Sequence, residues 1–556
     1  MWLAVSACND GGDMQPADET SSTGTTAAVD SSTSAPSDLD TTAGEDPSTS
    51  SSSSGEPADP PPPPLPWTDD CTYINSDLSR LNERLECAGV TVPLDHDDPE
   101  GESITIAAYK IPTTMAPRRG QFWLLAGGPG SSGLSFLSNA ELTDALNDAG
   151  WDVLVPSHRG TLSPPLDCDN PDFSSCRDGL EDSWGDGLRH FNSTQAGHDI
   201  AVLAEREQQD LDDAIVVYGV SYGTMWAMHY GSLHPEQADA LVLDSVLPSE
   251  VDVLTQEAQQ QVSVEEILQR CVDDPLCGPT LPYASGTEFS NAVTAAITDG
   301  ECGPQDPGTW QQTDYRTELG TLLNGGSRDY VPLMAALLAA CTPETSEIYE
   351  MALPGLFSAS FAMAPPSPGP LLELPRYDVD SDLFFYRALQ YVVMGTTVLR
   401  NETDPTPITE EAEGNLVGLG FANLFHTVHD VWTTLPDVDP LPPYPTELPT
   451  LILSGAFDLQ TPLGWAIDTA ADFGPDAQHF LVFDSARHGV ATSGVTFDDQ
   501  PCARDIMLAF SADPLAKLDI SCMDDTPPVD TTLQRPDLQQ TSAEVFGIDD
   551  PWTLVP

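Results

Sequence analysis

The chain has 556 residues, which is enough for two or three domains and a large buried core. Its 88 acidic residues outnumber its 19 lysines and arginines, so the formal net charge is −69 at pH 7. This balance argues against nucleic acid as a partner, because phosphates need basic contacts, and against attraction to an anionic membrane surface. We interpret the charge as a solvated acidic surface suited to a salty medium, the alternative being a field that steers cationic substrates.

The N-terminal 66 residues have no features of a folded domain. In residues 1–8, small residues precede Cys8, which resembles a bacterial lipoprotein signal although its usual basic region is missing. We interpret residues 1–8 as a truncated signal with Cys8 as its lipidation site, the alternative being a chance match. Residues 9–66 contain no Lys or Arg and end in a proline run, which predicts a disordered acidic linker. No stretch of about 20 apolar residues is present, so membrane attachment is expected only through the lipid.

The chain contains eleven cysteines. With Cys8 set aside, ten remain, and none has the spacing of a zinc site, so no metal or other cofactor is expected. An even number of clustered cysteines predicts up to five disulfides and export to an oxidising compartment, the alternative being ten reduced thiols in a cytosolic protein. By proximity in the sequence the pairs would be Cys71–Cys87, Cys168–Cys176, Cys271–Cys277, Cys302–Cys341 and Cys502–Cys522.

Residues 67–248 alternate between strand-like and helix-like segments. Apolar runs that predict strands lie at 103–109, 121–126, 151–156, 214–220 and 239–244. A helix is expected at 224–234. This alternation predicts a mostly parallel sheet with helices on both faces. The strand at 121–126 leads into a glycine loop, Gly127-Gly128-Pro129-Gly130, where the backbone can approach a ligand closely.

The turn after the strand at 214–220 reads Gly219-Val220-Ser221-Tyr222-Gly223. This spacing is typical of a nucleophile elbow, in which a serine occupies a strained turn and the glycines keep neighbouring chains clear of it. The turn also places the hydroxyl at a helix N-terminus, where N–H groups favour negative charge. Chance could supply the five-residue pattern, so its weight comes from the strand before it and the helix after it.

Residues 249–445 break the alternation. Helices are expected at 249–270, 315–323, 330–341 and 382–399, with proline-rich joins, so we interpret this region as a helical cap inserted in the sheet domain. Residues 446–556 resume the alternation, with strands at 451–454 and 479–484. His426, His429 and Asp430 are spaced like metal ligands but have no further partners, so a structural role is expected for them.

Three residue types that act together in acyl transfer follow three of the expected strands. They are Ser221, Asp458 and His488, in the chain order of the α/β-hydrolases. The C-terminal ends of parallel strands share one edge, so these distant side chains can converge. Serine needs a base to take its proton, histidine can accept and return that proton, and a carboxylate fixes the imidazole tautomer.

These residues resemble a family of α/β-hydrolase peptidases that includes prolyl aminopeptidases and secreted tripeptidyl aminopeptidases. The resemblance covers about residues 85–248 and 445–525. It rests on Val92-Pro93-Leu94-Asp95, the glycine loop, Arg159-Gly160-Thr161, the elbow, Leu243-Asp244, and Asp458 with Thr461-Pro462. It implies an α/β-hydrolase fold with Ser221 as nucleophile, Asp458 as acid and His488 as base. It also implies that Tyr222 and Gly128 supply the oxyanion N–H groups, and that Cys502 and Cys522 belong to the C-terminal region of the longer, secreted branch.

The sequence departs from the family in places that bear on specificity. Ala126 stands where the family usually has a histidine before the glycine loop. Family aminopeptidases bind the substrate amine through cap carboxylates, often beside a Cys-x-Glu-like motif. The corresponding segment, Tyr391–Thr397, carries neither residue, and Glu344 is another candidate. The triad is therefore better supported than aminopeptidase specificity.

Together these features predict an exported serine hydrolase, a cell-envelope lipoprotein or secreted protein, whose substrate is a peptide cleaved near its free N-terminus. One alternative is an esterase or other amide hydrolase with the same machinery, acting on a small ester or amide. The alternative of another class is a catalytically silent binding protein on the envelope. Peptide length, residue preference and oligomeric state do not follow from the sequence.

Overall fold

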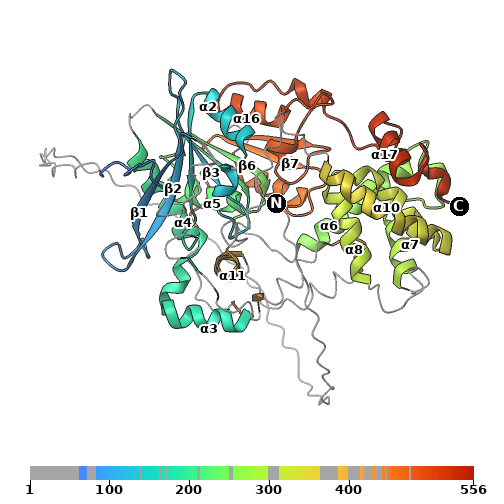
Figure 1. The fold of residues 1–556 in the computed structure, drawn as a ribbon, viewed down its shortest axis with the longest axis horizontal. Helices are drawn as coiled ribbons and strands as arrows, with labels where there is room; N and C mark the ends of the chain where they lie inside the picture. The colour runs from blue at the N-terminus through green and yellow to red at the C-terminus, as the bar shows by residue number, and fades with distance from the viewer. Residues whose placement is uncertain are drawn as a thin grey trace, which may run out of the picture. The chain divides into compact units, whose positions relative to one another are not determined.

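An eight-stranded sheet organises the protein (Figure 1), with the strand order β1-β2-β4-β3-β5-β6-β7-β8. The first two strands pair antiparallel with their neighbours, and all later pairings are parallel. The strands are β1 (Glu86–Pro93), β2 (Ser103–Ile111), β3 (Gly120–Leu125), β4 (Trp151–Pro156), β5 (Ala214–Ser221), β6 (Ala240–Val246), β7 (Thr450–Gly455) and β8 (Gln478–Phe483).

The computed structural model describes most of the chain from Pro62 onward, which forms one unit. The described residues are 62–71, 83–137, 139–161, 165–166, 168, 173–208, 213–249, 255–298, 312–362, 386–398, 414–418, 428–429, 431–432, 441–445, 447–474 and 478–556. Cys8 and most of the expected linker lie outside them. Over these ranges no helix is long and apolar enough to span a bilayer.

The central strands are buried on both faces, because helices cover the sheet on each side. Alternate residues of β3 show the two faces: Trp123 belongs to one apolar cluster and Phe122 to the other. Helices α4 (Ser193–Glu207) and α5 (Tyr222–Leu233) contribute to the first cluster. Helices α2 (Ala140–Asp148) and α16 (Cys502–Ala512) contribute to the second.

A helical region lies between β6 and β7 in the chain. It contains α6 (Thr255–Asp273), α7 (Gly286–Thr298), α8 (Gln312–Asn324), α9 (Val331–Ala340), α10 (Pro343–Ala362) and α11 (Arg387–Val393), which continues as a π-helix over Met394–Val398. All four helices expected there are present with shifted ends, whereas α7 and α10 were not expected. Most of these helices share a third apolar cluster. The other α-helices in the described ranges are α1 (Leu134–Leu137), α3 (Phe173–Trp184), α14 (Leu463–Asp472), α15 (Val490–Ser493) and α17 (Pro536–Phe546).

Two expected boundaries differ in the structure. Leu65 is 6% exposed and packs in the first cluster, and the Arg206 guanidinium donates to the Pro63 carbonyl over 2.8 Å. The packed part of the chain therefore begins before Trp67, because Leu65 fixes the end of the proline run against the first cluster. At the other end, Leu538 and Trp552 pack in the third cluster, so the C-terminal segment joins the helical region rather than the sheet.

Four of the five expected disulfides are present: Cys71–Cys87, Cys168–Cys176, Cys271–Cys277 and Cys502–Cys522. The fifth expected pair includes Cys302, which lies outside the described residues. Each observed bond closes a short loop, and the Cys502–Cys522 bond joins the start of α16 to the segment after it. Because each cross-link restricts the unfolded chain, together these bonds favour the folded state.

Candidate active site

Ser221 occupies a strained turn between β5 and α5. It ends the strand with φ +58° and ψ −129°, and the helix begins at Tyr222. A non-glycine residue at positive φ costs roughly 1–3 kcal/mol and persists only where its surroundings impose it. The Thr224 hydroxyl contributes, since it donates to the Ser221 carbonyl over 2.6 Å and accepts the Leu247 N–H over 2.8 Å. The elbow expected from the sequence is thus a sharp strand-to-helix turn.

The two glycines of the elbow allow close backbone approach. A Cβ on Gly219 would lie 2.1 Å from the Gly223 carbonyl oxygen, and a Cβ on Gly223 would lie 2.2 Å from the Leu125 carbonyl oxygen. Real side chains do not tolerate such contacts with backbone atoms. The pattern Gly-x-Ser-x-Gly therefore reflects the packing of α5 against the ends of β5 and β3.

We expect Gly223→Ala to reduce the free energy of unfolding by at least about 3 kcal/mol, because the backbone atoms around the added methyl cannot move aside independently. Gly179→Ala is the matched control, since Gly179 lies in the exposed helix α3 with no atom within 4 Å of an added Cβ. That change should stabilise the protein by up to about 1 kcal/mol. Urea unfolding measures the stability of both variants. Equal unfolding midpoints for Gly223→Ala and the native protein would contradict the packing described.

The glycine loop lies directly against the serine. A Cβ on Gly127 would lie 2.9 Å from the Ser221 Cβ and 3.4 Å from its Oγ, so only bare backbone fits there. Gly128 is the next residue of this loop. On the other side, Tyr222 is the first residue of α5, and its N–H therefore has no acceptor within the helix. The structure thus brings the loop of Gly128, and Tyr222 itself, to Ser221, and their role as oxyanion donors stays a prediction.

Asp458 and His488 form a direct pair at the same edge of the sheet. Asp458 follows β7 and His488 follows β8, and His488 Nδ1 lies 2.8 Å from Asp458 Oδ2. The Asp458 carboxylate is fully buried, and it also accepts the Gln460 N–H over 2.9 Å and the Thr461 hydroxyl over 2.8 Å. These donors hold the carboxylate in the orientation that meets the imidazole.

The pKa values of this pair move in opposite directions. Burial alone would raise the pKa of Asp458, but the charge and hydrogen bond of His488 and the Thr461 donors outweigh it and lower that pKa. Burial alone would lower the pKa of His488, but Asp458 outweighs it and raises the pKa above 6.5. Asp458 therefore stays ionised, keeps the proton of His488 on Nδ1, and leaves Nε2 as the basic nitrogen.

Ser221 ends β5 and His488 follows β8, with β6 and β7 between these two strands in the sheet. Asp244 of β6 pairs with Val220 of β5, and Asp244 also binds the segment after His488. In the described part of the chain, Ser221 Oγ makes no hydrogen bond to His488. Catalytic contacts of this kind often shorten only when substrate binds. The structure therefore joins Asp458 and His488 directly, and the contact of His488 with Ser221 stays a prediction.

The helical region holds the loops of the acid and the base. From α6, the Gln256 and Gln260 side-chain amides donate to the carbonyls of Gln460 and Leu459, each over 2.7 Å. Arg328, at the start of α9, donates to the Ala486 carbonyl over 2.8 Å, two residues before His488. Sequence analysis missed these residues because their partners are backbone atoms, which leave no pattern of side-chain types.

A second contact joins the helical region to the glycine loop. The Tyr386 N–H, just before α11, donates to the Gly130 carbonyl over 2.8 Å. A Cβ on Gly130 would lie 2.5 Å from the Tyr386 carbonyl oxygen, which leaves no room for a side chain. The following segment, Tyr391–Thr397, is buried and carries no carboxylate. The segment that resembles the amine-binding region thus adjoins the glycine loop without supplying a negative charge.

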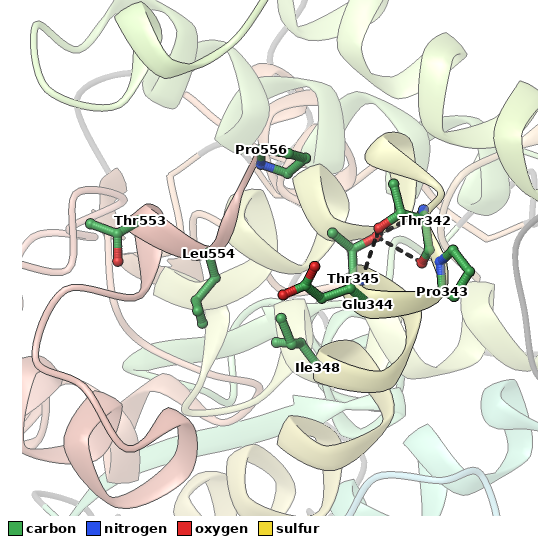
Figure 2. Close-up of a pocket in the computed structure, with 8 residues that line it drawn as sticks. All are labelled: Thr342, Pro343, Glu344, Thr345, Ile348, Thr553, Leu554 and Pro556. Atoms are coloured by element: carbon green, nitrogen blue, oxygen red, sulfur yellow. Dashed lines mark hydrogen bonds between the residues drawn. The ribbon is translucent and has the colours of Figure 1, made fainter.

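Glu344 has a different setting. It is exposed on the first turn of α10 and lines a pocket of about 530 Å³ with Thr342, Ile348 and the C-terminal residues Thr553, Leu554 and Pro556 (Figure 2). None of the residues that line this pocket belongs to the loops of Ser221, Asp458 or His488. The structure therefore gives no support to Glu344 as a group that binds a substrate amine at the triad.

A buried polar network holds the Tyr222 side chain. The Tyr222 hydroxyl lies 2.9 Å from His158 Nε2 and 2.8 Å from Ser193 Oγ, and His158 Nδ1 donates to the Arg159 carbonyl. Burial lowers the pKa of His158 to about 4, so this imidazole is neutral at neutral pH. Arg159 is fully buried and binds both oxygens of Asp199. The motif Arg159-Gly160-Thr161 is therefore structural, since its arginine ties α4 to the loop after β1.

In the described ranges, no group of three His, Cys, Asp or Glu side chains could hold a metal ion. His426 and Asp430 lie outside those ranges, so the spacing noted around His429 is not described.

Comparisons with known proteins show which sequences and folds this chain resembles. A family model for the alpha/beta hydrolase fold matches residues 122–266. A tripeptidyl aminopeptidase from Streptomyces lividans is 28% identical over 221 residues, which cover 33% of this chain and 40% of that protein. The serine protease Hip1 from Mycobacterium tuberculosis is 22% identical over 249 residues, which cover 40% of this chain and 47% of that protein. The chain thus spans less than half the length of the curated relatives that it matches.

The sheet, the elbow and the family match define an α/β-hydrolase. Within that class, the chain is similar in sequence to the tripeptidyl aminopeptidase and to Hip1. Among solved structures, a proline iminopeptidase from Mycobacterium smegmatis is 16% identical, covers 77% of this chain and 99% of that one, and superposes with a TM-score of 0.34.

Proposed function

We propose that this protein is a serine hydrolase that removes short peptides or single residues from the free N-terminus of a peptide. The observation that carries the proposal is the Asp458–His488 pair, in a sheet whose β5 ends in the strained Ser221. Ser221 Oγ attacks the carbonyl carbon while His488 Nε2 takes its proton. The Tyr222 and Gly128 N–H groups bind the resulting oxyanion. His488 then gives the proton to the leaving amine, and water, with His488 as base, releases the acyl group from Ser221.

Relatives named as an aminopeptidase and a serine protease support a peptide substrate. The disulfides support export, so cell fractionation should find the protein outside the cytoplasm. A second candidate, an esterase or other amide hydrolase, is favoured by one observation: the buried segment Tyr391–Thr397 beside the glycine loop offers no carboxylate for a substrate amine.

A substrate panel separates these two activities. We expect tripeptidyl- and aminoacyl-naphthylamides with a free amine to be cleaved at least about tenfold faster, by kcat/KM, than their N-acetylated forms, because one lost charge-assisted hydrogen bond costs roughly 1.5–3 kcal/mol. The rate of cleavage of short-chain nitrophenyl esters tests for the alternative esterase activity. Equal rates for free and blocked peptides, with faster ester cleavage, would favour the esterase. No turnover of any of these substrates would contradict both.

A further inference from the structure

Side chains at the end of β6 bind the three consecutive backbone N–H groups that follow His488. The Gly489 N–H donates to Ser245 Oγ over 2.9 Å. The Val490 N–H donates to Asp244 Oδ1 over 2.6 Å, and the Ala491 N–H donates to Asp244 Oδ2 over 2.8 Å. Both carboxylate oxygens are thus used on one short segment, which begins at the residue after His488.

Asp244 is itself held in place. Its carboxylate is fully buried and accepts the Tyr218 hydroxyl over 2.8 Å and the Ser245 hydroxyl over 3.2 Å. Tyr218 lies on β5, three residues before Ser221, and β6 lies between β5 and β7 in the sheet. A carboxylate that accepts four donors has its hydrogen-bonding capacity filled. Asp244 therefore links the strand of the nucleophile to the segment of the base.

The bond to Asp458 does not by itself fix the imidazole. A ring held only through Nδ1 can pivot about that bond, and Nε2 then moves relative to Ser221. Pinning the backbone just beyond His488 removes that freedom, because the main chain that carries the ring cannot shift. Oriented reacting groups are worth several orders of magnitude in rate, and a displacement of about 1 Å can cost about a hundredfold.

We propose that Asp244, assisted by Ser245, is a positioning residue for the base: it holds the segment after His488 so that Nε2 keeps its place at Ser221. This inference rests on the proposed serine-hydrolase function and concerns no new substrate. Asp244 acts through the backbone and does not touch the reacting atoms.

The test is steady-state kinetics of Asp244→Asn, with the fastest substrate of the panel and over a range of pH. The amide has a single acceptor oxygen, so either the Val490 or the Ala491 N–H loses its partner. We expect kcat to fall about tenfold to a hundredfold with KM within about twofold. The lower-pH limb of kcat/KM should also move to lower pH, because the Asp244 charge raises the pKa of His488.

The other charged groups near His488 are the same in the native protein and in Asp244→Asn. Asp458 faces the ring, Arg487 precedes it, and Arg328 reaches Ala486 from the helical region. Asp152→Asn is the matched control: its buried carboxylate also accepts a backbone N–H, from Thr113 over 2.8 Å, but lies outside the loops of the triad. That variant should lose stability and leave kcat and the pH limb unchanged.

The outcomes separate the positioning role from the enzyme function. If the native protein turns over no substrate, the proposed function fails. If it is active and a folded Asp244→Asn variant keeps the native kcat and pH limb, the positioning role is overturned. If Asp244→Asn does not fold, Ser245→Ala decides: it removes the contacts of the Ser245 hydroxyl with Gly489 and with Asp244, leaves the Asp244 carboxylate on Val490 and Ala491, and should lower kcat about threefold to tenfold. A native kcat in that variant would overturn the proposal.

Discussion

Ser221→Ala should lower kcat by about 10⁴-fold or more with the fold unchanged. Alanine keeps the strained backbone of the elbow, since its Cβ occupies the same position as that of serine, but it has no hydroxyl to attack the carbonyl. The remaining activity would come from substrate binding and from the oxyanion donors alone. A fluorophosphonate should label the native protein at Ser221 and leave the variant unlabelled, as mass spectrometry of the tryptic peptides would show.

Ser183→Ala provides the control for that comparison. Ser183 is exposed in α3, where its hydroxyl donates to the Gly179 carbonyl. Its loss should change neither kcat nor labelling. If the Ser221→Ala variant kept more than about a tenth of the native kcat, an acyl-enzyme on Ser221 would be refuted, because no triad enzyme tolerates loss of its nucleophile to that degree.

Asp458→Asn should lower kcat by about 10⁴-fold and also change its pH dependence. In the native protein Asp458 raises the pKa of His488 above 6.5, so kcat/KM should rise with pH along a limb that lies above pH 6.5. His488 acts as a base only when neutral, which is why activity is lost as pH falls. Without the negative charge, the limb moves to lower pH, while an asparagine amide favours the wrong imidazole tautomer and depresses kcat at every pH.

Asp530→Asn is the matched control for this variant. Asp530 likewise accepts backbone and hydroxyl donors, from Thr532 and Arg535, but in the C-terminal segment. The lower-pH limb of kcat/KM for Asp530→Asn should coincide with that of the native protein. If the lower-pH limb of kcat/KM lay at the same pH in Asp458→Asn as in the native protein, another group would carry the base function.

The strands that carry the three candidate residues could be predicted, because each is a short apolar run. Ser221 ends β5, while Asp458 follows β7 and His488 follows β8. Their joint action as a triad stays a prediction. The spacing of glycines in the elbow was equally informative, since the backbone contacts of Gly219 and Gly223 exclude any other residue.

Other features depend on contacts that no local pattern encodes. Asp244 and Ser245 meet the segment after His488 across 244 to 247 positions of the chain, and their partners are backbone N–H groups. The same holds for Gln260 and its contact with the Leu459 carbonyl. The helix α10 was missed because its Pro354 reads as a break, although the described helix continues past it.

The hydrogen bond between Tyr386 and Gly130 has a mechanical consequence. It joins the backbone just before α11 to the loop whose N–H groups are expected to bind the oxyanion. A displacement of α11 must either break this bond or pull the glycine loop away from Ser221. The geometry of the loop expected to bind the oxyanion therefore depends on a main-chain contact with the helical region as well as on the sheet.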